Sequence, residues 1–530
     1  MFGKTKHIHF VGIGGIGMSG MAELLHKLGF NISGSDQNSS ERTESLQTMG
    51  LHISEGHSGE NVNGADVVVY SSAIQRDNPE ILAAENKQVP VIRRAEMLAE
   101  LLKVKPTSIA IAGTHGKTTT CSMLGEILTA AELNPTMVIG GIVNKFQSNT
   151  ISGSGDVIVV EADEFDRSFL TLQPTMGLIT NLDLEHLDCY ENLEDLQMAF
   201  TQFANAVPFY GKVGVCIDNS NAASIIPNIK RPVVTFGVHE DAEIQASNLQ
   251  FENNHSTFTL SIHGEPRGEL TVHVPGEHNV KNALGAAVLA LELDTPFDKI
   301  QAGLDQYTGV RRRFDIKYTT DKNIMIVDDY AHHPSEVSAT LKAAKTGWNN
   351  RIIAIFQPHL FTRTRDFYHD FAEEFLQADI LIVTDIYQAR EKPIPGITAQ
   401  IISDEAERLG HKHVELIADQ TNIPARLKEI VQGKKHQISV SVDIVGHLSA
   451  TGNWFSNQQE DHQILAEFIQ LNKEIPTQIT VDTSIYQNAG ANIVQQLAYA
   501  MAHVNEYLNH LNEHFPQQLK EFQPTFKVAT

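Results

Sequence analysis

The sequence predicts an α/β protein of three domains followed by a mixed, mainly helical tail. Two observations predict this fold class: apolar strand patterns alternate with helical patterns up to about residue 435, and two strand-to-helix turns are rich in glycine. A chain of 530 residues is too long for one hydrophobic core, and a prior of about 150 residues per domain suggests three or four. We expect domains at 1–105, 106–312 and 313–435, with the tail at 436–530.

The first domain opens with the pattern of a dinucleotide-binding fold. An apolar strand beginning at His7 leads into a glycine-rich turn and a helix, and the next strand ends at an acidic residue. Taken alone, this pattern indicates an NAD-dependent dehydrogenase, but any diphosphate nucleotide can bind at such a helix N-terminus. A later strand ends at two serines that we also expect near the diphosphate or sugar. The predicted site residues are Gly12, Gly14, Gly15, Gly17, Asp36, Ser71 and Ser72.

The segment AGTHGKTTT at 112–120 lies between an apolar strand and a helical pattern, and predicts a phosphate-binding loop. Gly113 and Gly116 let backbone N–H groups, including that of Thr114, turn toward phosphate oxygens. Lys117 can reach the β- and γ-phosphates, and the hydroxyl of Thr118 or Thr119 can hold Mg²⁺. We therefore expect the protein to consume a nucleoside triphosphate.

Carboxylates follow two later strands of the second domain. The strand VIVVEA leads into Asp163, Glu164 and Asp166, and the strand MGLIT leads into Asn181, Asp183, Glu185, His186 and Asp188. The carboxyl ends of strands are where α/β sites bind metals, although Mg²⁺ takes only one or two protein oxygens. Further on, His278, Asn279 and Asn282 stand at the start of a helix, where capping explains the first two almost as well as ligand contact does.

Composition disfavours several classes of function. The net charge is −24, and no block of Lys or Arg is long enough to form a nucleic-acid-binding stripe. No apolar run reaches the ~18 residues of a membrane span, and no signal peptide precedes the first strand. The three cysteines show no metal or disulfide spacing. We expect a soluble cytoplasmic protein, monomeric or homodimeric, without nucleic-acid binding or membrane insertion.

A dozen motifs, taken in order and spacing, carry a resemblance to a known family. They include GIGGIGMSG, AGTHGKTTT, EADEFDRSFL, TNLDLEHLD, GEHNVKNAL, GVRRRFD, DDYAHHPSE and FQPHLFTRT, and they extend from about residue 5 to about residue 430. This part of the chain resembles Mur ligases, above all those that join L-alanine to UDP-N-acetylmuramate. The resemblance implies a Rossmann-like first domain that binds the UDP-sugar, a P-loop central domain that binds ATP and Mg²⁺, and a Rossmann-like third domain. It removes the dehydrogenase interpretation.

The resemblance also implies roles for individual residues. Lys117, His186, Arg313 and His332 would be catalytic, and Thr118, Thr119, Glu164 and His186 would lie at the metal. His278, Asn279 and Asn282 would surround the adenine, and Arg312 or Arg313 would close onto the phosphates, with Arg313 favoured because it adjoins Phe314. Tyr330, His332, His359 and Arg363 would hold the alanine. Arg363 suits the carboxylate because its planar fork makes two parallel hydrogen bonds, and His332 suits the ammonium proton.

The chain departs from the family pattern in two places. Leu360 stands where arginine is common, so Arg363 would carry more of the carboxylate binding. After IVQGKK the expected last strand and its Gly-Ala-Gly-Asp turn are replaced by HQISVSVDIVG, so the third domain appears truncated. The tail resembles a fragment of the small subunit of methylmalonyl-CoA mutase, without any cobalamin-binding segment. The alternating pattern of HQISVSVDIVG still predicts a strand that completes the third sheet.

Two alternative functions stay open at this point. One is a ligase that recycles a whole tripeptide onto the same sugar nucleotide, which needs a larger amino-substrate pocket. The other is a catalytically dead sugar-nucleotide-binding fusion protein, which the apparent truncation of the third domain suggests.

Overall fold

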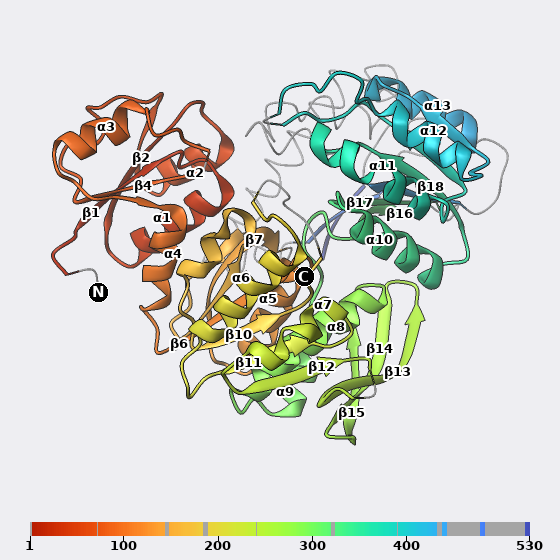
Figure 1. Cartoon of the computed structure of the whole chain (residues 1–530), viewed down its shortest axis with the longest axis horizontal. Coiled ribbons are helices and arrows are strands. Elements are labelled where there is room, and N and C mark those ends of the chain that lie inside the picture. Colours follow the sequence, from red (N-terminus) through yellow and green to blue (C-terminus); the bar gives the residue numbers. More distant parts are fainter. Residues whose placement is uncertain are drawn as a thin grey trace. The chain divides into compact units, whose positions relative to one another are not determined.

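The computed structural model describes ten stretches of the chain (Figure 1). They are residues 3–71, 73–143, 148–183, 189–239, 241–319, 324–389, 391–431, 437–442, 478–482 and 525–529. The contacts divide these residues into two compact units. The first holds the chain up to Ile423 with Val431 and the strand at 437–442, and the second holds Pro424–Ile430 and the last two strands.

The N-terminal sheet has five parallel strands in the order β3-β2-β1-β4-β5. Its strands are β1 (His7–Val11), β2 (Asn31–Asp36), β3 (His52–Glu55), β4 (Val67–Tyr70) and β5 (Val91–Arg93), and its helices are α1 (Ile16–Lys27), α2 (Glu41–Thr48), α3 (Pro79–Asn86) and α4 (Arg94–Leu102). Strand order reverses between β1 and β4, so the glycine-rich turn after β1 lies at the switch point where such sheets bind ligands. The predicted Rossmann-like fold is confirmed.

The central sheet has ten strands in the order β15-β14-β13-β12-β11-β10-β6-β9-β7-β8. Its strands are β6 (Thr107–Ala112), β7 (Thr136–Val143), β8 (Ser148–Ile151), β9 (Val157–Ala162), β10 (Met176–Ile179), β11 (Lys212–Cys216), β12 (Val233–Gly237), β13 (Ile244–Glu252), β14 (His255–Ile262) and β15 (Glu265–Val272). Strands β6, β7 and β9 to β12 run parallel, so their carboxyl ends share one edge of the sheet. That edge carries the phosphate-binding loop.

The helices of the central region are α5 (Lys117–Ala130), α6 (Leu193–Ala206), α7 (Ser220–Ser224), α8 (Glu277–Leu291) and α9 (Phe297–Asp305), with the 3₁₀ helices η1 (Phe165–Thr171) and η2 (Ile226–Asn228). Helices α5 and α8 are mostly buried and belong to one hydrophobic cluster with strands of the sheet. Because α5 is fixed in the core, the loop at its N-terminus stands on a rigid support.

The third sheet has six strands in the order β16-β17-β21-β18-β19-β20. Its strands are β16 (Asp315–Thr319), β17 (Ile324–Asp329), β18 (Arg351–Phe356), β19 (Ile380–Val383), β20 (Val414–Leu416) and β21 (Gln437–Val442). The helices of this region are α10 (Pro334–Gly347), α11 (Phe361–Phe375), α12 (Gln400–Arg408) and η3 (Gln420–Asn422). The next helix along the chain is α13 (Ile423–Val431), most of which belongs to the second unit. All strands except β16 run parallel.

Strand β21 comes from the segment that replaces the family's last strand. It lies inside the sheet and pairs in parallel with β17 on one side and β18 on the other, over its whole length. The prediction that this segment forms a strand and completes the third sheet is confirmed. The third domain therefore has a continuous six-stranded sheet despite its unusual sequence.

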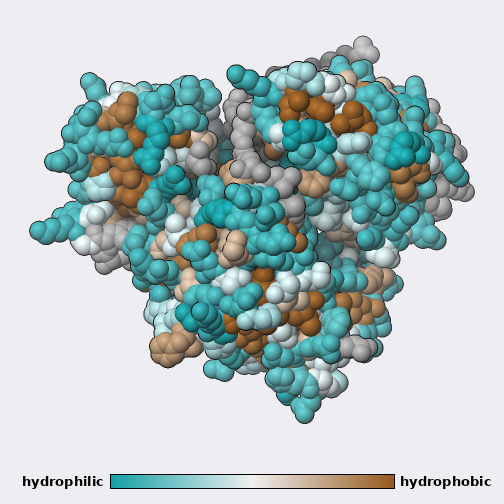
Figure 2. All heavy atoms as spheres, in the orientation of Figure 1, coloured by the Kyte–Doolittle hydropathy of each residue, from teal (hydrophilic) through white to brown (hydrophobic). Residues whose placement is uncertain are grey.

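Of the rest of the tail, the structure describes β22 (Gln478–Asp482) and β23 (Thr525–Ala529), which pair in parallel. The predicted tail helices lie outside the described residues. Within the described ranges, no helix combines the length and the apolar character needed to cross a membrane. The face in Figure 2 is mainly hydrophilic, with hydrophobic residues in small separate patches.

Candidate active site

The phosphate-binding loop follows β6 and needs glycine at both predicted positions. Gly113 and Gly116 have φ values of 137° and 84°, which side chains with a Cβ rarely adopt. A Cβ on Gly116 would also lie 2.3 Å from Asn282 Oδ1. The end of β10 braces the loop, because Asn181 Oδ1 accepts from the N–H of His115 at 2.8 Å and Thr180 Oγ1 donates to the His115 carbonyl at 2.6 Å. The loop is therefore preformed at the N-terminus of α5.

Lys117 and Glu164 form an ion pair beneath this loop. Lys117 Nζ donates to Glu164 Oε2 at 2.7 Å and to the carbonyl of Thr114 at 3.1 Å. Burial alone would lower the pKa of Lys117, but the negative charges of Glu164 and Asp163 outweigh it and raise that pKa. Burial raises the pKa of Glu164 to about 7 despite the lysine. The pair thus places a cation and a carboxyl group side by side at the loop.

The acidic segment after β9 has a constrained backbone. Asp166 and Arg167 both have positive φ, 54° and 58°, which is strained for residues with side chains. Arg167 donates to the Cys189 carbonyl at 3.1 Å and pairs with Asp195, and its guanidinium lies 4.7 Å from the centre of the Tyr190 ring. The Tyr190 hydroxyl donates to the Glu164 carbonyl at 2.7 Å. These contacts fix the backbone that carries Glu164.

The donor set next to the loop fits a magnesium ion bound with a triphosphate. In the part of the chain that the structure describes, no three His, Cys, Asp or Glu side chains gather as a protein-only metal site. Mg²⁺ does not need such a cage, because it binds through one or two carboxylates together with phosphate and water oxygens. Glu164, only 2% exposed, and the hydroxyls of Thr118 and Thr119 supply oxygens of this kind. His186 lies outside the described residues.

A cavity of about 280 Å³ lies next to the loop. It is lined by residues of the P-loop, of the carboxyl ends of β10 and β11, of α8 and of the third domain: His115, Gly116, Thr118, Thr119, Thr180, Asn181, Asp183, Cys216, Asp218, Asn219, Phe236, His278, Asn279, Lys281, Asn282, Arg313, Phe314, Asp329, Ser335, Glu336, Ala339 and Thr340. The cavity thus combines a phosphate-binding end with aromatic and amide side chains that suit a nucleotide base.

The three predicted adenine residues line this cavity. Helix α8 begins after Gly276 and no side chain caps it, so capping does not explain His278 or Asn279. Asn279 Nδ2 donates to the Pro275 carbonyl at 2.7 Å, and Asn282 Nδ2 donates to Asn279 Oδ1 at 3.3 Å. Burial, with the positive charges of Lys281 and Arg313, lowers the pKa of His278 to about 4. His278 is therefore a neutral imidazole at neutral pH.

The two arginines before the third domain have different surroundings. Arg313 lines the cavity, and its Nη1 lies 3.2 Å from Glu336 Oε1. Arg312 has a φ of 62° and is not among the lining residues, and its guanidinium lies 4.4 Å from the centre of the Tyr330 ring. Arg313 also lies 5.7 Å from the centre of the Tyr330 ring, so both arginines are near this tyrosine and only Arg313 lines the cavity.

The four residues predicted to hold the amino acid form one cluster at the carboxyl ends of β17 and β18. The Tyr330 and His332 rings lie 4.9 Å apart, and the His332 and His359 rings 6.1 Å apart. Arg363 Nη1 lies 3.2 Å from His359 Nδ1. Leu360 caps α11 with a φ of 72°. The two pairs follow different strands, and the parallel sheet brings them together.

The glycine-rich turn of the first domain is held by the acidic residue predicted with it. The Gly14 N–H donates to Asp36 Oδ2 at 2.8 Å. Gly12 has a φ of 79°, and a Cβ there would lie 3.4 Å from the Cβ of Ser71. The turn, Asp36 and Ser71 therefore meet at the switch point, while Gly15 is the N-cap of α1 and Gly17 lies in its first turn. Ser72 lies outside the described residues.

Three sequence-family models match the chain in succession. They are the Mur ligase family, catalytic domain (7–106), the Mur ligase middle domain (111–290) and the Mur ligase, glutamate ligase domain (312–439). A protein of Trichlorobacter lovleyi named UDP-N-acetylmuramate--L-alanine ligase is 49% identical over 435 residues, which cover 82% of this chain and 95% of that protein. The chain belongs to the Mur ligase family. A fourth model, Methylmalonyl-CoA mutase, matches 421–525.

Solved structures agree with this assignment. The UDP-N-acetylmuramate-alanine ligase of Thermotoga maritima is 29% identical with a TM-score of 0.70, and the match covers 86% of this chain and all of that one. A murein peptide ligase of Psychrobacter arcticus is 22% identical with a TM-score of 0.62, covering 89% of this chain and 99% of that one, and shows the common fold alone. The three-domain architecture predicted for this Mur ligase is confirmed.

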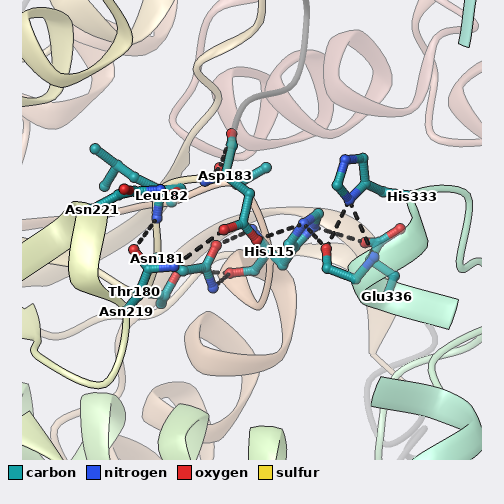
Figure 3. A network of polar contacts seen from close by, with 12 residues as sticks. His115, Thr180, Asn181, Leu182, Asp183, Asn219, Asn221, His333 and Glu336 are labelled. Atoms are coloured by element: carbon teal, nitrogen blue, oxygen red, sulfur yellow. Dashed lines mark hydrogen bonds and ion pairs between the residues drawn. The ribbon is translucent and has the colours of Figure 1, made fainter. Parts of the chain in front are cut away.

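Sequence reasoning missed two residues of this Mur ligase's site, His115 and Glu336. His115 extends from the P-loop and lies between Asp183 and Glu336 in Figure 3. Burial alone would raise the pKa of Asp183, but the hydrogen bond and charge of His115 lower it. One signal was available for Glu336, which is an acidic residue in the first turn of a helix, at the end of the motif that supplies His332.

Proposed function

We propose that this Mur ligase joins L-alanine to the lactyl carboxylate of UDP-N-acetylmuramate, converting ATP to ADP and phosphate in peptidoglycan precursor synthesis. The observation that carries the proposal is that one cavity is lined both by the P-loop and by the third domain, next to the cluster of Tyr330, His332, His359 and Arg363. Relatives that are 48–49% identical over nearly their whole length are named UDP-N-acetylmuramate--L-alanine ligase, which supports the choice of L-alanine.

The nucleotide end of the site would bind ATP through the glycine loop and Lys117. Backbone N–H groups at the N-terminus of α5 face the phosphates, and Lys117 exchanges its bond with Glu164 for one with the β- and γ-phosphates. His278, Asn279 and Asn282 would contact the adenine. Mg²⁺, held by Glu164 and a threonine hydroxyl, with His186 predicted nearby, would neutralise charge on the triphosphate.

The first chemical step needs two anions to approach each other. A lactyl carboxylate oxygen attacks the γ-phosphorus, the bond from that phosphorus to the bridging oxygen breaks, and ADP leaves with the electron pair. Lys117 and Arg313 place positive charge where the transferred phosphoryl group becomes most negative. The product of this step is an acyl phosphate.

The second step uses the cluster in the third domain. Arg363 would bind the alanine carboxylate, and His332 would accept a proton from the ammonium. His332 Nδ1 lies 2.8 Å from the Tyr330 carbonyl oxygen, so its proton belongs on Nδ1 and the basic lone pair on Nε2. The freed amine attacks the acyl carbon, a tetrahedral intermediate forms, and phosphate leaves with the electron pair of the C–O bond.

The first domain would bind the UDP-sugar through Gly12, Gly14, Gly15 and Gly17, with Asp36, Ser71 and Ser72 close by. Asp36 already bonds the turn, which supports a role in shaping the diphosphate site. We propose domain limits at 1–105, 106–312 and 313–435 and a tail at 436–530 whose first strand, β21, belongs to the third sheet, with a monomer or homodimer in the cytoplasm.

Phosphate release from ATP, Mg²⁺ and UDP-N-acetylmuramate tests this function, with L-alanine compared against the tripeptide L-alanyl-γ-D-glutamyl-meso-diaminopimelate. We expect release with L-alanine and at most trace release with tripeptide. A preference for the tripeptide would assign the chain to the recycling ligases. Release with neither, while the UDP-sugar still binds, would favour a sugar-nucleotide-binding protein without ligase activity.

A further inference from the structure

Glu336 is a buried carboxylate on which three basic groups converge. Its side chain is 9% exposed. Oε1 lies 3.2 Å from His115 Nδ1 and 3.2 Å from Arg313 Nη1. Oε2 accepts from the backbone N–H of His332 at 3.0 Å and lies 3.2 Å from His332 Nδ1.

The two oxygens of this carboxylate face different parts of the site. His115 comes from the P-loop and Arg313 from the segment that enters the third domain, and both line the cavity. His332 comes from the end of β17 and belongs to the amino-acid cluster. Oε1 therefore bonds the nucleotide end, and Oε2 bonds the amino-acid end.

A second set of contacts links His115 of the P-loop to α10. His115 Nε2 lies 2.8 Å from Ser335 Oγ and 3.4 Å from Asp183 Oδ2, so the imidazole joins the first turn of α10 to the end of β10 (Figure 3). Burial alone would raise the pKa of Glu336, but the charges of His332, His115 and Arg313 lower it well below its usual value. The carboxylate is thus ionised while all three partners surround it.

A purely structural role for Glu336 would require fewer contacts than the structure shows. An acidic residue in the first turn of a helix interacts favourably with the helix dipole. That role involves only α10. Its loss would lower the stability of the protein without a specific change in kcat/KM for ATP or for L-alanine. The bonds to His115 and Arg313, from outside the helix, are not needed for it.

We propose that Glu336 is a positioning residue that couples the nucleotide end of the site to the amino-acid end, by holding His115 and Arg313 on one oxygen and His332 on the other. The inference rests on the proposed function. It predicts that the P-loop contact and the orientation of His332 are gained or lost together, so that the amine is activated only when the nucleotide end is assembled.

The test uses the full chain with Glu336→Gln, and Glu407→Gln as the matched control. Glu407 lies exposed on α12 of the same domain. We expect E336Q to keep its unfolding temperature within a few degrees, yet to lower kcat/KM for both ATP and L-alanine by about tenfold or more, as loss of charge-assisted hydrogen bonds does. E407Q should match the wild type. Equal kinetics for E336Q and the wild type would overturn the proposal, as would a lowered unfolding temperature with unchanged kinetics.

Two double-mutant cycles separate coupling from independent damage. For H115N with E336Q, kcat/KM for ATP in the double variant should lie within about twofold of the worse single variant. For H332N with E336Q, the same is expected of kcat/KM for L-alanine. Multiplicative losses in either cycle would show that Glu336 does not act through that partner, and would contradict the proposal.

A binding measurement distinguishes failure of this inference from failure of the proposed function. Calorimetry gives the affinity for L-alanine with and without the non-hydrolysable analogue adenylyl imidodiphosphate. We expect the analogue to strengthen alanine binding in the wild type and in E407Q, but not in E336Q. If the analogue strengthens alanine binding as expected but no phosphate is released in the ligase assay, the proposed ligase activity is wrong and the inference stands. If phosphate is released and the analogue strengthens alanine binding equally in all three proteins, only the inference is wrong.

Discussion

Removing β21 should abolish the function of the third domain, whereas removing the tail beyond it should not. The perturbation is a pair of truncations, one after Gly433, which deletes β21, and one after Trp454, which retains it. The strand lies between β17 and β18, so its loss leaves an unpaired edge on both of them.

The size of the effect follows from the pairing. Each of the six residues of β21 has a registered partner in β17 and another in β18. An internal strand uses nearly all its backbone donors and acceptors, so about twelve hydrogen bonds at ~1 kcal/mol each give a gross ~10 kcal/mol. Folded domains are more stable than their unfolded states by only about 5–15 kcal/mol. Direct pairing of β17 with β18 would recover part of this energy but would move the strands about 4.8 Å closer.

The assay is thermal unfolding together with alanine-dependent phosphate release. After truncation at Gly433 we expect the third domain to lose its cooperative transition, and release to fall at least a hundredfold, which corresponds to ~2.7 kcal/mol at the transition state. After truncation at Trp454, unfolding and release should match the full chain. Equal behaviour of the two truncations would refute the assignment of β21 to the fold. Loss of activity on removing only residues 455–530 would show that the distal tail is integral to the enzyme.

Three further outcomes follow from the proposed roles. Lys117→Ala should lower turnover by ~10³-fold or more in steady-state phosphate release, because Lys117 places a charge on the transferred phosphoryl group, and near-normal turnover would contradict the ligase mechanism. Arg363→Lys should raise the apparent KM for L-alanine far more than that for ATP, because an ammonium cannot make a bidentate contact. An unchanged alanine KM would give Arg363 a structural role. UDP-N-acetylmuramate should raise the unfolding temperature and NAD should not, because only a bound ligand stabilises by mass action. The opposite result would restore the dehydrogenase interpretation.

The sequence predicted best those parts of the site that lie in one continuous segment. Gly113 and Gly116 stand where a strand meets a helix, and residues with a Cβ rarely adopt the positive φ found there. In the turn of the first domain Gly12 also has a positive φ, whereas at Gly14 a Cβ would lie 2.9 Å from Asp36 Oδ2. In such segments the local backbone and the function impose the same residue types, so a short pattern carries both.

Contacts between distant segments could not be predicted from these patterns. His115 and Ser335 are 220 positions apart, yet their side chains lie 2.8 Å from each other. The run of three arginines did not show which side chain would face the nucleotide. Arg313 lines the cavity, while Arg312 has a positive φ and does not line it. A pattern of residue types does not contain such a backbone conformation.

The position of β21 also explains how a segment that matches a different protein family can form part of this enzyme. Tyr330 and His332 follow β17, while His359 and Arg363 follow β18, and β21 separates these two strands. With neighbouring strands about 4.8 Å apart, one intervening strand places β17 and β18 roughly 10 Å from each other. The His332 and His359 rings lie 6.1 Å apart in an edge-to-face arrangement, so the two halves of the cluster meet past the intervening strand. The segment at 437–442, half of it beyond the end of the Mur ligase match and all of it within the Methylmalonyl-CoA mutase match, therefore separates the two strands that carry the proposed amino-acid residues. Backbone pairing is enough for this role, because a parallel spacer strand needs the right length and register rather than a particular family's side chains.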